Sequence, residues 1–213
     1  GTAFAVRKVF QDSAVTSSIT AFGLDGPHAG WPVKVAGNAS VPTVGPKGRA
    51  YVVVAAADGR SAWVRVFERG GARVRGWSPR LAVEPESAWR GAGAPIEGPA
   101  PAVVARDGSA WLVGERVGIP GMKARALAPT GAVRAGWPVR SDSHVSDAGR
   151  CNGCVTGCGN DRVAPVAGPG DILYVALDAR TSTVGGRIAA LDLRGRNRPG
   201  WPITLARRGA EFW

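Results

Sequence analysis

The chain has 213 residues, a length that can bury the core of one domain. It carries 27 basic against 16 acidic residues, a formal net charge of +11, and only three cysteines. No apolar run reaches the roughly 18 residues that a membrane-spanning helix needs, which excludes a span of that kind.

Short hydrophobic runs, separated by turns rich in Gly, Asp and Pro, follow one another from the first residues onward. Residues 1–35 contain three such runs, and four runs occur in each of the stretches 40–81, 100–140 and 163–205. Val, Ile, Tyr and Trp are typical of strands, and apolar residues at helical spacing are never sustained. The sequence therefore predicts four-stranded antiparallel units with strands A to D in chain order, and strand A is missing from the first unit.

A Gly-Trp-Pro motif begins strand D of each unit, an edge position where proline is tolerated. The four copies are Gly30-Trp31-Pro32, Gly76-Trp77-Ser78-Pro79, Gly136-Trp137-Pro138 and Gly200-Trp201-Pro202. Tandem four-stranded units predict an all-β fold, a β-propeller of about four blades with an incomplete first blade. A β-sandwich with coincidental Trp spacing is the alternative. We expect the repeated Trp side chains to pack between blades.

The unit resembles the bacterial propeller repeats of the PQQ-like and FG-GAP-like groups in its Asp-Gly turns, its aromatic strand B and its Gly-Trp-Pro strand D. The resemblance covers most of the chain and implies a secreted or cell-surface bacterial protein. Quinoprotein dehydrogenases use a related motif, which residues 190–201 match only loosely. The spacing departs from that motif, its proline is foreign to it, and the adjacent Cys-Cys pair of many such dehydrogenases is absent. We therefore expect no quinone cofactor.

The incomplete first unit can be completed in two ways. Either the tail, residues 206–213, returns as strand A and closes a four-bladed ring, or the chain is a fragment or processed product completed by more chain or by a second copy. We favour the second interpretation. An open propeller exposes two sheet faces, and such a surface needs a partner.

Arginines concentrate in the turns between strands C and D, which lie on one face of a propeller. They are Arg73, Arg75, Arg134, Arg194, Arg196 and Arg198. Guanidinium groups suit carboxylate, phosphate and sulfate groups, so this face is a candidate docking surface for an acidic partner or an anionic polymer. The alternative is a solvated rim without a ligand. No recognition motif or aromatic stacking series points to nucleic acid.

All three cysteines lie in the link between the third and fourth units, at Cys151, Cys154 and Cys158. One disulfide plus a free or intermolecular thiol fits an exported protein and is the preferred interpretation. A zinc site is the alternative, because Cys151 and Cys154 have C-x-x-C spacing and Cys158 and His144 can complete four ligands. An iron–sulfur cluster with an open site is a further alternative. We expect this link on the face opposite the arginine-rich turns.

Hydrolytic chemistry finds little support, since no Gly-x-Ser-x-Gly elbow occurs and most acidic residues stand at turns. The sequence therefore predicts a non-enzymatic extracytoplasmic propeller without a cofactor. Its expected role is protein–protein or surface interaction within a larger assembly. The alternatives are a metal- or redox-bearing propeller with the Cys151–Cys158 loop as its site, and a carbohydrate-binding propeller.

Overall fold

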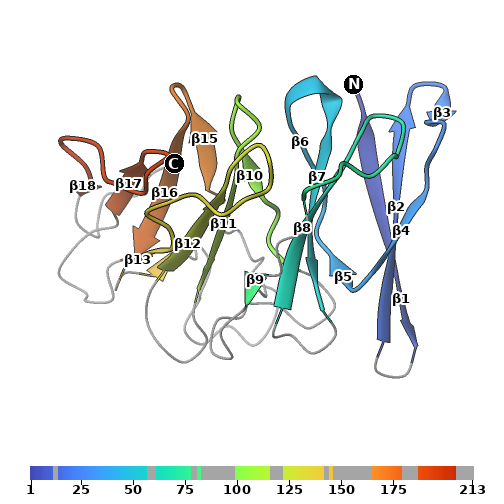
Figure 1. Ribbon diagram of the computed structural model, residues 1–213, viewed down its shortest axis with the longest axis horizontal. Coiled ribbons are helices and arrows are strands. Elements are labelled where there is room, and N and C mark those ends of the chain that lie inside the picture. The colour runs from blue at the N-terminus through green and yellow to red at the C-terminus, as the bar shows by residue number, and fades with distance from the viewer. Residues whose placement is uncertain are drawn as a thin grey trace, which may run out of the picture.

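The computed structural model describes residues 1–11, 14–56, 61–77, 81–82, 99–115, 122–141, 144–145, 165–178 and 187–204. Strands make up the regular structure of these residues, apart from the short 3-10 helix η1 (Pro46–Gly48). Every strand pair is antiparallel. The prediction of an all-β fold is confirmed. Four sheets follow one another in chain order and stand side by side (Figure 1).

The first sheet contains β1 (Ala3–Gln11), β2 (Ala14–Gly23), β3 (Gly26–Pro27) and β4 (Val33–Ala36), with β2 between β1 and β4. Exposure alternates along β1, as expected of a strand with one covered face. Phe4 and Val6 face the second sheet, where they pack against a buried cluster. The opposite face of β1 is exposed to solvent at Ala3, Ala5 and Arg7.

The second sheet has strands at the A, B, C and D positions. They are β5 (Asn38–Ala39) and β6 (Thr43–Val44), which both pair with β7 (Ala50–Ala55), followed by β8 (Ser61–Phe67) and β9 (Leu81–Ala82). Residues 50–54 of β7 are all buried, because sheets cover both faces of this strand.

The third sheet consists of β10 (Val103–Val104), β11 (Ala110–Glu115), β12 (Met122–Leu127) and β13 (Val139–Ser141) in that spatial order. The fourth contains β14 (His144–Val145), β15 (Val166–Gly168), β16 (Ile172–Asp178), β17 (Arg187–Leu191) and β18 (Ile203–Thr204). Its two short strands β14 and β15 share β16, as β5 and β6 share β7. The same hairpin order thus recurs in the second, third and fourth sheets.

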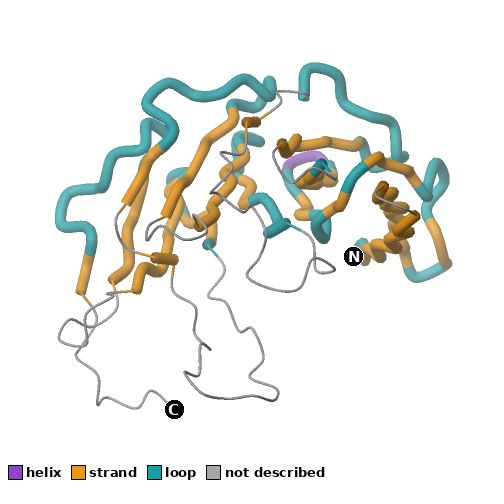
Figure 2. Tube along the Cα trace, turned by 90° about the horizontal axis from the view of Figure 1, so that it is seen from below, coloured by secondary structure: helices purple, strands orange, loops and turns teal. Residues whose placement is uncertain are grey.

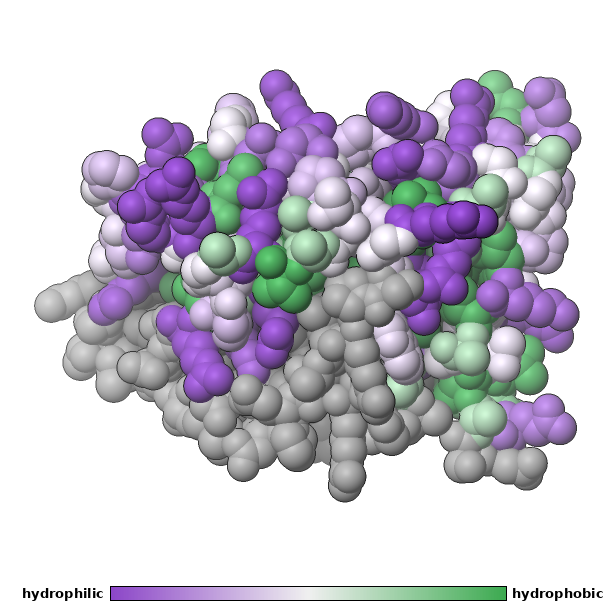
Figure 3. Space-filling model, viewed as in Figure 1, coloured by the Kyte–Doolittle hydropathy of each residue, from purple (hydrophilic) through white to green (hydrophobic). Residues whose placement is uncertain are grey.

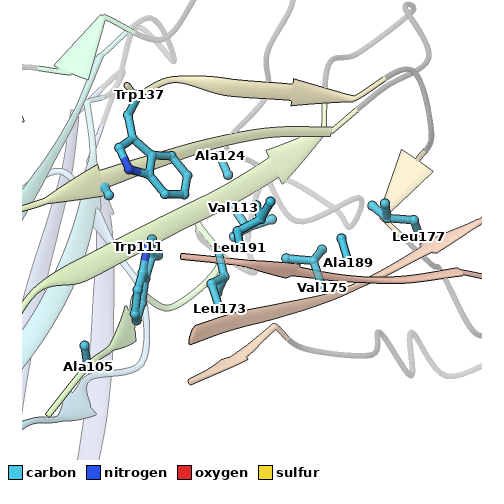
Figure 4. Close-up of a cluster of buried hydrophobic side chains, with 11 residues drawn as sticks. Ala105, Trp111, Val113, Ala124, Trp137, Leu173, Val175, Leu177, Ala189 and Leu191 are labelled. Atoms are coloured by element: carbon cyan, nitrogen blue, oxygen red, sulfur yellow. The ribbon is translucent and has the colours of Figure 1, made fainter. Parts of the chain in front are cut away.

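Three hydrophobic clusters fill the spaces between neighbouring sheets. The cluster between the third and fourth sheets joins Trp111 and Trp137 to Leu173, Val175 and Leu191, as Figure 4 shows. Seen from below, the sheets follow an arc, and the first and last sheets stand at its two ends (Figure 2). The core is therefore a series of layers between sheets, and one face of each end sheet has no neighbouring sheet among the described residues.

The turns that join A to B and C to D emerge at one end of all the sheets, because successive strands of a hairpin reverse direction. This end is the upper edge in Figure 1, and hydrophilic side chains gather along it in Figure 3. In the described ranges, no helix has the length and apolar character needed to cross a membrane.

Candidate functional site: a basic turn surface

The C–D turns of the second, third and fourth sheets share one local structure. In the second sheet, Glu68 donates its backbone N–H to the carbonyl of Ala72, and Gly71 donates to the carbonyl of Glu68. The same two hydrogen bonds recur at Ala128 and Asp192, and the third residue after each start is a glycine with positive φ. A short bridge such as Phe67 to Arg73 then closes the turn. Arg134 and Arg198 follow their turns at matching positions, whereas Arg73 and Arg75 stand one position before and one after the equivalent residue Val74.

Each of these turns is anchored to the preceding sheet by a tryptophan of the Gly-Trp-Pro motif. The indole N–H donates to a turn carbonyl in three places: Trp31 to Arg69 at 2.9 Å, Trp77 to Pro129 at 3.1 Å and Trp137 to Leu193 at 3.0 Å. These three indoles are at most 9% exposed. The expectation that the repeated Trp side chains pack between units therefore holds at these three positions. The indole hydrogen bonds also fix the position of each turn relative to the preceding sheet.

The glycine before each of these tryptophans lets two backbones meet. A Cβ on Gly30 would overlap the carbonyl of Gly70, and a Cβ on Gly71 would overlap the carbonyl of Gly30. The pair Gly76 and Gly131 shows the same approach, since a Cβ on Gly131 would lie 2.7 Å from the Gly76 carbonyl oxygen. Only glycine allows this approach at positive φ. We call the combination of glycine contact, indole hydrogen bond and apolar cluster the inter-sheet joint.

Five of the six predicted arginines are exposed at the turn end. They are Arg73, Arg75, Arg194, Arg196 and Arg198. The sixth, Arg134, is half-buried and makes an ion pair of 2.8 Å with Asp107 and a hydrogen bond of 2.6 Å to the hydroxyl of Ser109. Its guanidinium group holds two turns of the third sheet together, so it is a structural member of this surface.

Three further exposed basic residues stand at the same end and were missed by the sequence reasoning: Lys47, Arg69 and Arg106. Lys47 and Arg106 lie in A–B turns, which share an end with the C–D turns because of the hairpin order. That topological relation is the signal that could have found them. The basic turn surface is defined by Lys47, Arg69, Arg73, Arg75, Arg106, Arg194, Arg196 and Arg198.

Acidic residues at this end are largely engaged in local structure. Glu68 forms an ion pair of 2.7 Å with Arg49, and this hydrogen-bonded contact raises the pKa of Arg49. Partial burial acts to raise the pKa of Asp192, but hydrogen bonds from the backbone N–H groups of Arg196 and Arg194 outweigh it and lower the pKa. The Asp192 carboxylate therefore stays ionised at neutral pH, and the exposed charge at this end of the sheets is mainly positive.

The predicted metal site cannot be placed, because Cys151, Cys154 and Cys158 lie outside the described residues. His144 belongs to β14, opposite Asp178 of β16. The next strand of this sheet, β15, begins at Val166, opposite Tyr174. The described strands on either side of the cysteine segment, β14 and β15, thus both pair with β16. Within the described residues, no group of three or more His, Cys, Asp or Glu side chains is arranged to hold a metal ion.

No protein-family model matches the chain, and no curated protein is similar to it.

Proposed function

We propose that this chain is a β-propeller-type repeat protein of an exported bacterial assembly, and that its basic turn surface binds an acidic protein or an anionic polymer without catalysing a reaction. The strand order of the second to fourth sheets, the layered core between sheets and the recurring Gly-Trp-Pro joint support the propeller assignment. The bacterial and exported setting rests on the resemblance of the repeat.

The observation that carries the proposed function is the exposure of basic side chains at one end of the second, third and fourth sheets. Arg75 in the second sheet and Arg194 and Arg198 in the fourth are exposed, and no acidic side chain of the described residues forms an ion pair with Arg75 or Arg198. The joints hold the turn backbones in place, so a ligand need not order them. An extended anion that contacts several turns would gain binding free energy from each contact.

Charge and hydrogen-bond geometry are sufficient for this role. A guanidinium group offers a planar fork of donors that matches a carboxylate or sulfate. An exposed ion pair contributes only about 0.2–1 kcal/mol, so useful affinity requires several contacts to one ligand. A row of turns meets that requirement, whereas a single arginine does not. Binding of this kind weakens with salt, because exposed charges are screened within about 8–10 Å at physiological ionic strength.

Fluorescence anisotropy with labelled polyglutamate tests the proposal, and a sulfated polysaccharide serves as the second probe. We expect salt-dependent binding of at least one probe, which the double variant R194S/R198S weakens about fivefold, the sum of two exposed ion pairs. The control R7S/K34S removes the same charge from exposed positions of the first sheet.

Equal weakening by both double variants would mean that only net charge matters and would overturn the assignment of the surface. Absence of binding to either probe at low salt would overturn the function itself. A preference for polyglutamate would point to an acidic protein partner, and a preference for the sulfated chain would point to a polysaccharide.

A further inference from the structure

The outer face of the fourth sheet carries one half of a fourth joint. Trp201 packs edge to face against Tyr174, with ring centroids 5.4 Å apart and an interplanar angle of 68°. The same pairing of a strand B aromatic with the motif tryptophan occurs in two complete joints, at 5.7 Å for Phe4 and Trp31 and at 5.3 Å for Tyr51 and Trp77. The aromatic pair of the fourth sheet therefore already has the geometry that such a pair has in a complete joint.

The partner of this half is missing from the described residues. A Cβ built on Gly200 meets no atom within 4 Å, whereas Gly30, Gly76 and Gly136 each lie against the turn of the next sheet. Among the described residues, the indole N–H of Trp201 has no acceptor, and its ring is half-buried where the other motif tryptophans are buried.

Apolar side chains extend this open face beyond the tryptophan. Ile188 lies opposite Ile203 and Val166 lies opposite Tyr174, so these residues share one face of the sheet. Val166 is 56% exposed and Ile203 is 40% exposed. In a joint, residues at such positions pack against the next sheet. We call this surface, with Gly200, Trp201 and Tyr174, the open tryptophan face.

The first sheet carries the complementary turn half. In complete joints the acceptor carbonyl belongs to the second residue after the end of strand C, for example Arg69 after Phe67. The His28 N–H bonds to the Ala21 carbonyl as the Val74 N–H bonds to the Val66 carbonyl, so Phe22 corresponds to Phe67 and Leu24 to Arg69. Leu24 is 98% exposed. The first turn is one residue shorter than the other three, and its Gly26 pairs with Gly23. Gly26 has φ of +113°, and a Cβ on it meets no atom within 4 Å. The described residues thus form three complete joints, and the fourth and first sheets each present one separate half of a further joint.

We propose that the open tryptophan face docks onto the first sheet of a second copy of this chain. In this joint the Trp201 indole N–H donates to the Leu24 carbonyl of the second copy, and Gly200 meets Gly26. The occupant is a second copy because its first sheet supplies the matching turn. Within one chain the two halves stand at opposite ends of the row of sheets (Figures 1 and 2). The proposal rests on the propeller part of the proposed function.

Head-to-tail docking is a heterologous contact, which closes into a ring when the rotation per copy allows it. Two copies with four sheets each supply eight, which is within the range of about four to eight blades that propellers have. We therefore expect a closed dimer in which each open tryptophan face covers one first sheet.

Sedimentation velocity from about 1 to 100 µM, where the Kd of a modest interface falls, tests the docking. We expect the wild-type chain to be dimeric and the variants G200N and L24D to be monomeric. Asn tolerates the positive φ of Gly200 (+80°), but its Cβ would meet the opposing turn. G170N is the matched control, since Gly170 has φ of +72° and open space around it, and it lies in an A–B turn away from the joint.

Mixing the two monomeric variants separates this geometry from any other self-association. G200N keeps an intact Leu24 half and L24D keeps an intact Trp201 half, so a head-to-tail arrangement predicts that the mixture recovers one joint and forms a heterodimer. A wild-type monomer throughout the concentration range, including the case in which the chain closes its own ring, would overturn the proposal. So would a dimer that G200N and L24D leave intact.

The sedimentation and anisotropy experiments together distinguish the docking from the anion binding. Polyglutamate binding by monomeric G200N, together with a failed mixing experiment, would remove the docking and leave the basic turn surface. A dimer that binds neither polymer would remove the anion-binding function and leave the docking.

Discussion

The joint between the second and third sheets and the open tryptophan face of the fourth sheet contain the same kinds of residue in different surroundings. Trp77 is 1% exposed and donates to the Pro129 carbonyl, whereas Trp201 is half-buried and packs edge to face on Tyr174. Each aromatic pair has nearly the same centroid distance, 5.3 Å and 5.4 Å. The pair is thus a property of one unit, and burial of the indole is a property of the contact between units.

The largest difference between these two regions should appear on truncation of the indole. We expect W77A to lower the free energy of unfolding by about 3–5 kcal/mol, because it removes a fully buried side chain and its hydrogen bond. W201A should cost roughly 1 kcal/mol or less in dilute monomeric protein. Urea unfolding of both variants in the G200N background gives the comparison, and an unchanged m-value supports a native-state effect.

Equal losses in the two variants would contradict the comparison. Such a result would mean that Trp201 is buried in solution by a contact within the same chain.

The residues that make the joint were visible in the sequence, but their partners were not. The Gly-Trp-Pro spacing predicted that its tryptophans pack between units. The prediction that the motif begins strand D was wrong, because the D strands begin after it, at Val33, Leu81, Val139 and Ile203. The acceptor carbonyls of Arg69, Pro129 and Leu193 lie 38, 52 and 56 residues away from their indoles. A backbone carbonyl carries no residue-specific signal, so a sequence pattern does not identify it.

The candidate site was predicted in its position and only partly in its chemistry. Arginine after the turn glycine predicts an exposed guanidinium group, and this holds for Arg75 and Arg198. Arg134 has the same sequence context, but Asp107 and Ser109 of the neighbouring A–B turn engage it. The difference depends on which residues the preceding hairpin places beside the turn. The division of strand A into β5 and β6, which both pair with β7, was also not predicted. A strand of two residues is too short to show the alternation of apolar and polar residues by which strands are recognised.

A smaller effect should separate the glycines of a joint from a glycine of a free turn. Substitution of Gly30 (φ of +82°) or Gly170 (φ of +72°) by Ala places a Cβ on a left-handed backbone. This lowers the free energy of unfolding by about 1–2 kcal/mol at either position. At Gly30 the new Cβ also overlaps the carbonyl of Gly70, and such overpacking costs about 1–3 kcal/mol more. We therefore expect G30A to unfold at clearly lower urea concentration than G170A.

If G30A loses no more unfolding free energy than G170A, the first joint accommodates the added methyl group without loss of stability. The backbone contact would then contribute nothing to the position of the turns, and the anchoring of the basic turn surface would depend on the indole alone.

The smallest expected effect concerns the first residue of the C–D turn, which is Asp192 in the fourth sheet and Ala128 in the third. The Asp192 carboxylate accepts backbone hydrogen bonds of 2.8 and 2.9 Å from Arg194 and Arg196, and these lower its pKa in the folded chain. A folded-state pKa below the unfolded value of about 3.9 stabilises the protein above about pH 4, and this contribution disappears as the pH falls through the folded pKa. The side chain is 33% exposed, so solvent screens the effect.

We expect D192A to cost about 0.5–1 kcal/mol at pH 7 and almost nothing at pH 2–3, because the protonated carboxyl accepts these hydrogen bonds weakly. D192N is the control, since its amide oxygen can still accept a hydrogen bond but carries no charge, and it should fall between the two proteins at pH 7. Urea unfolding at several pH values measures all three. A deficit of D192A that persists at low pH would show that the turn needs the shape of this side chain, and that the carboxylate charge does not hold Arg194 and Arg196 in place on the basic turn surface.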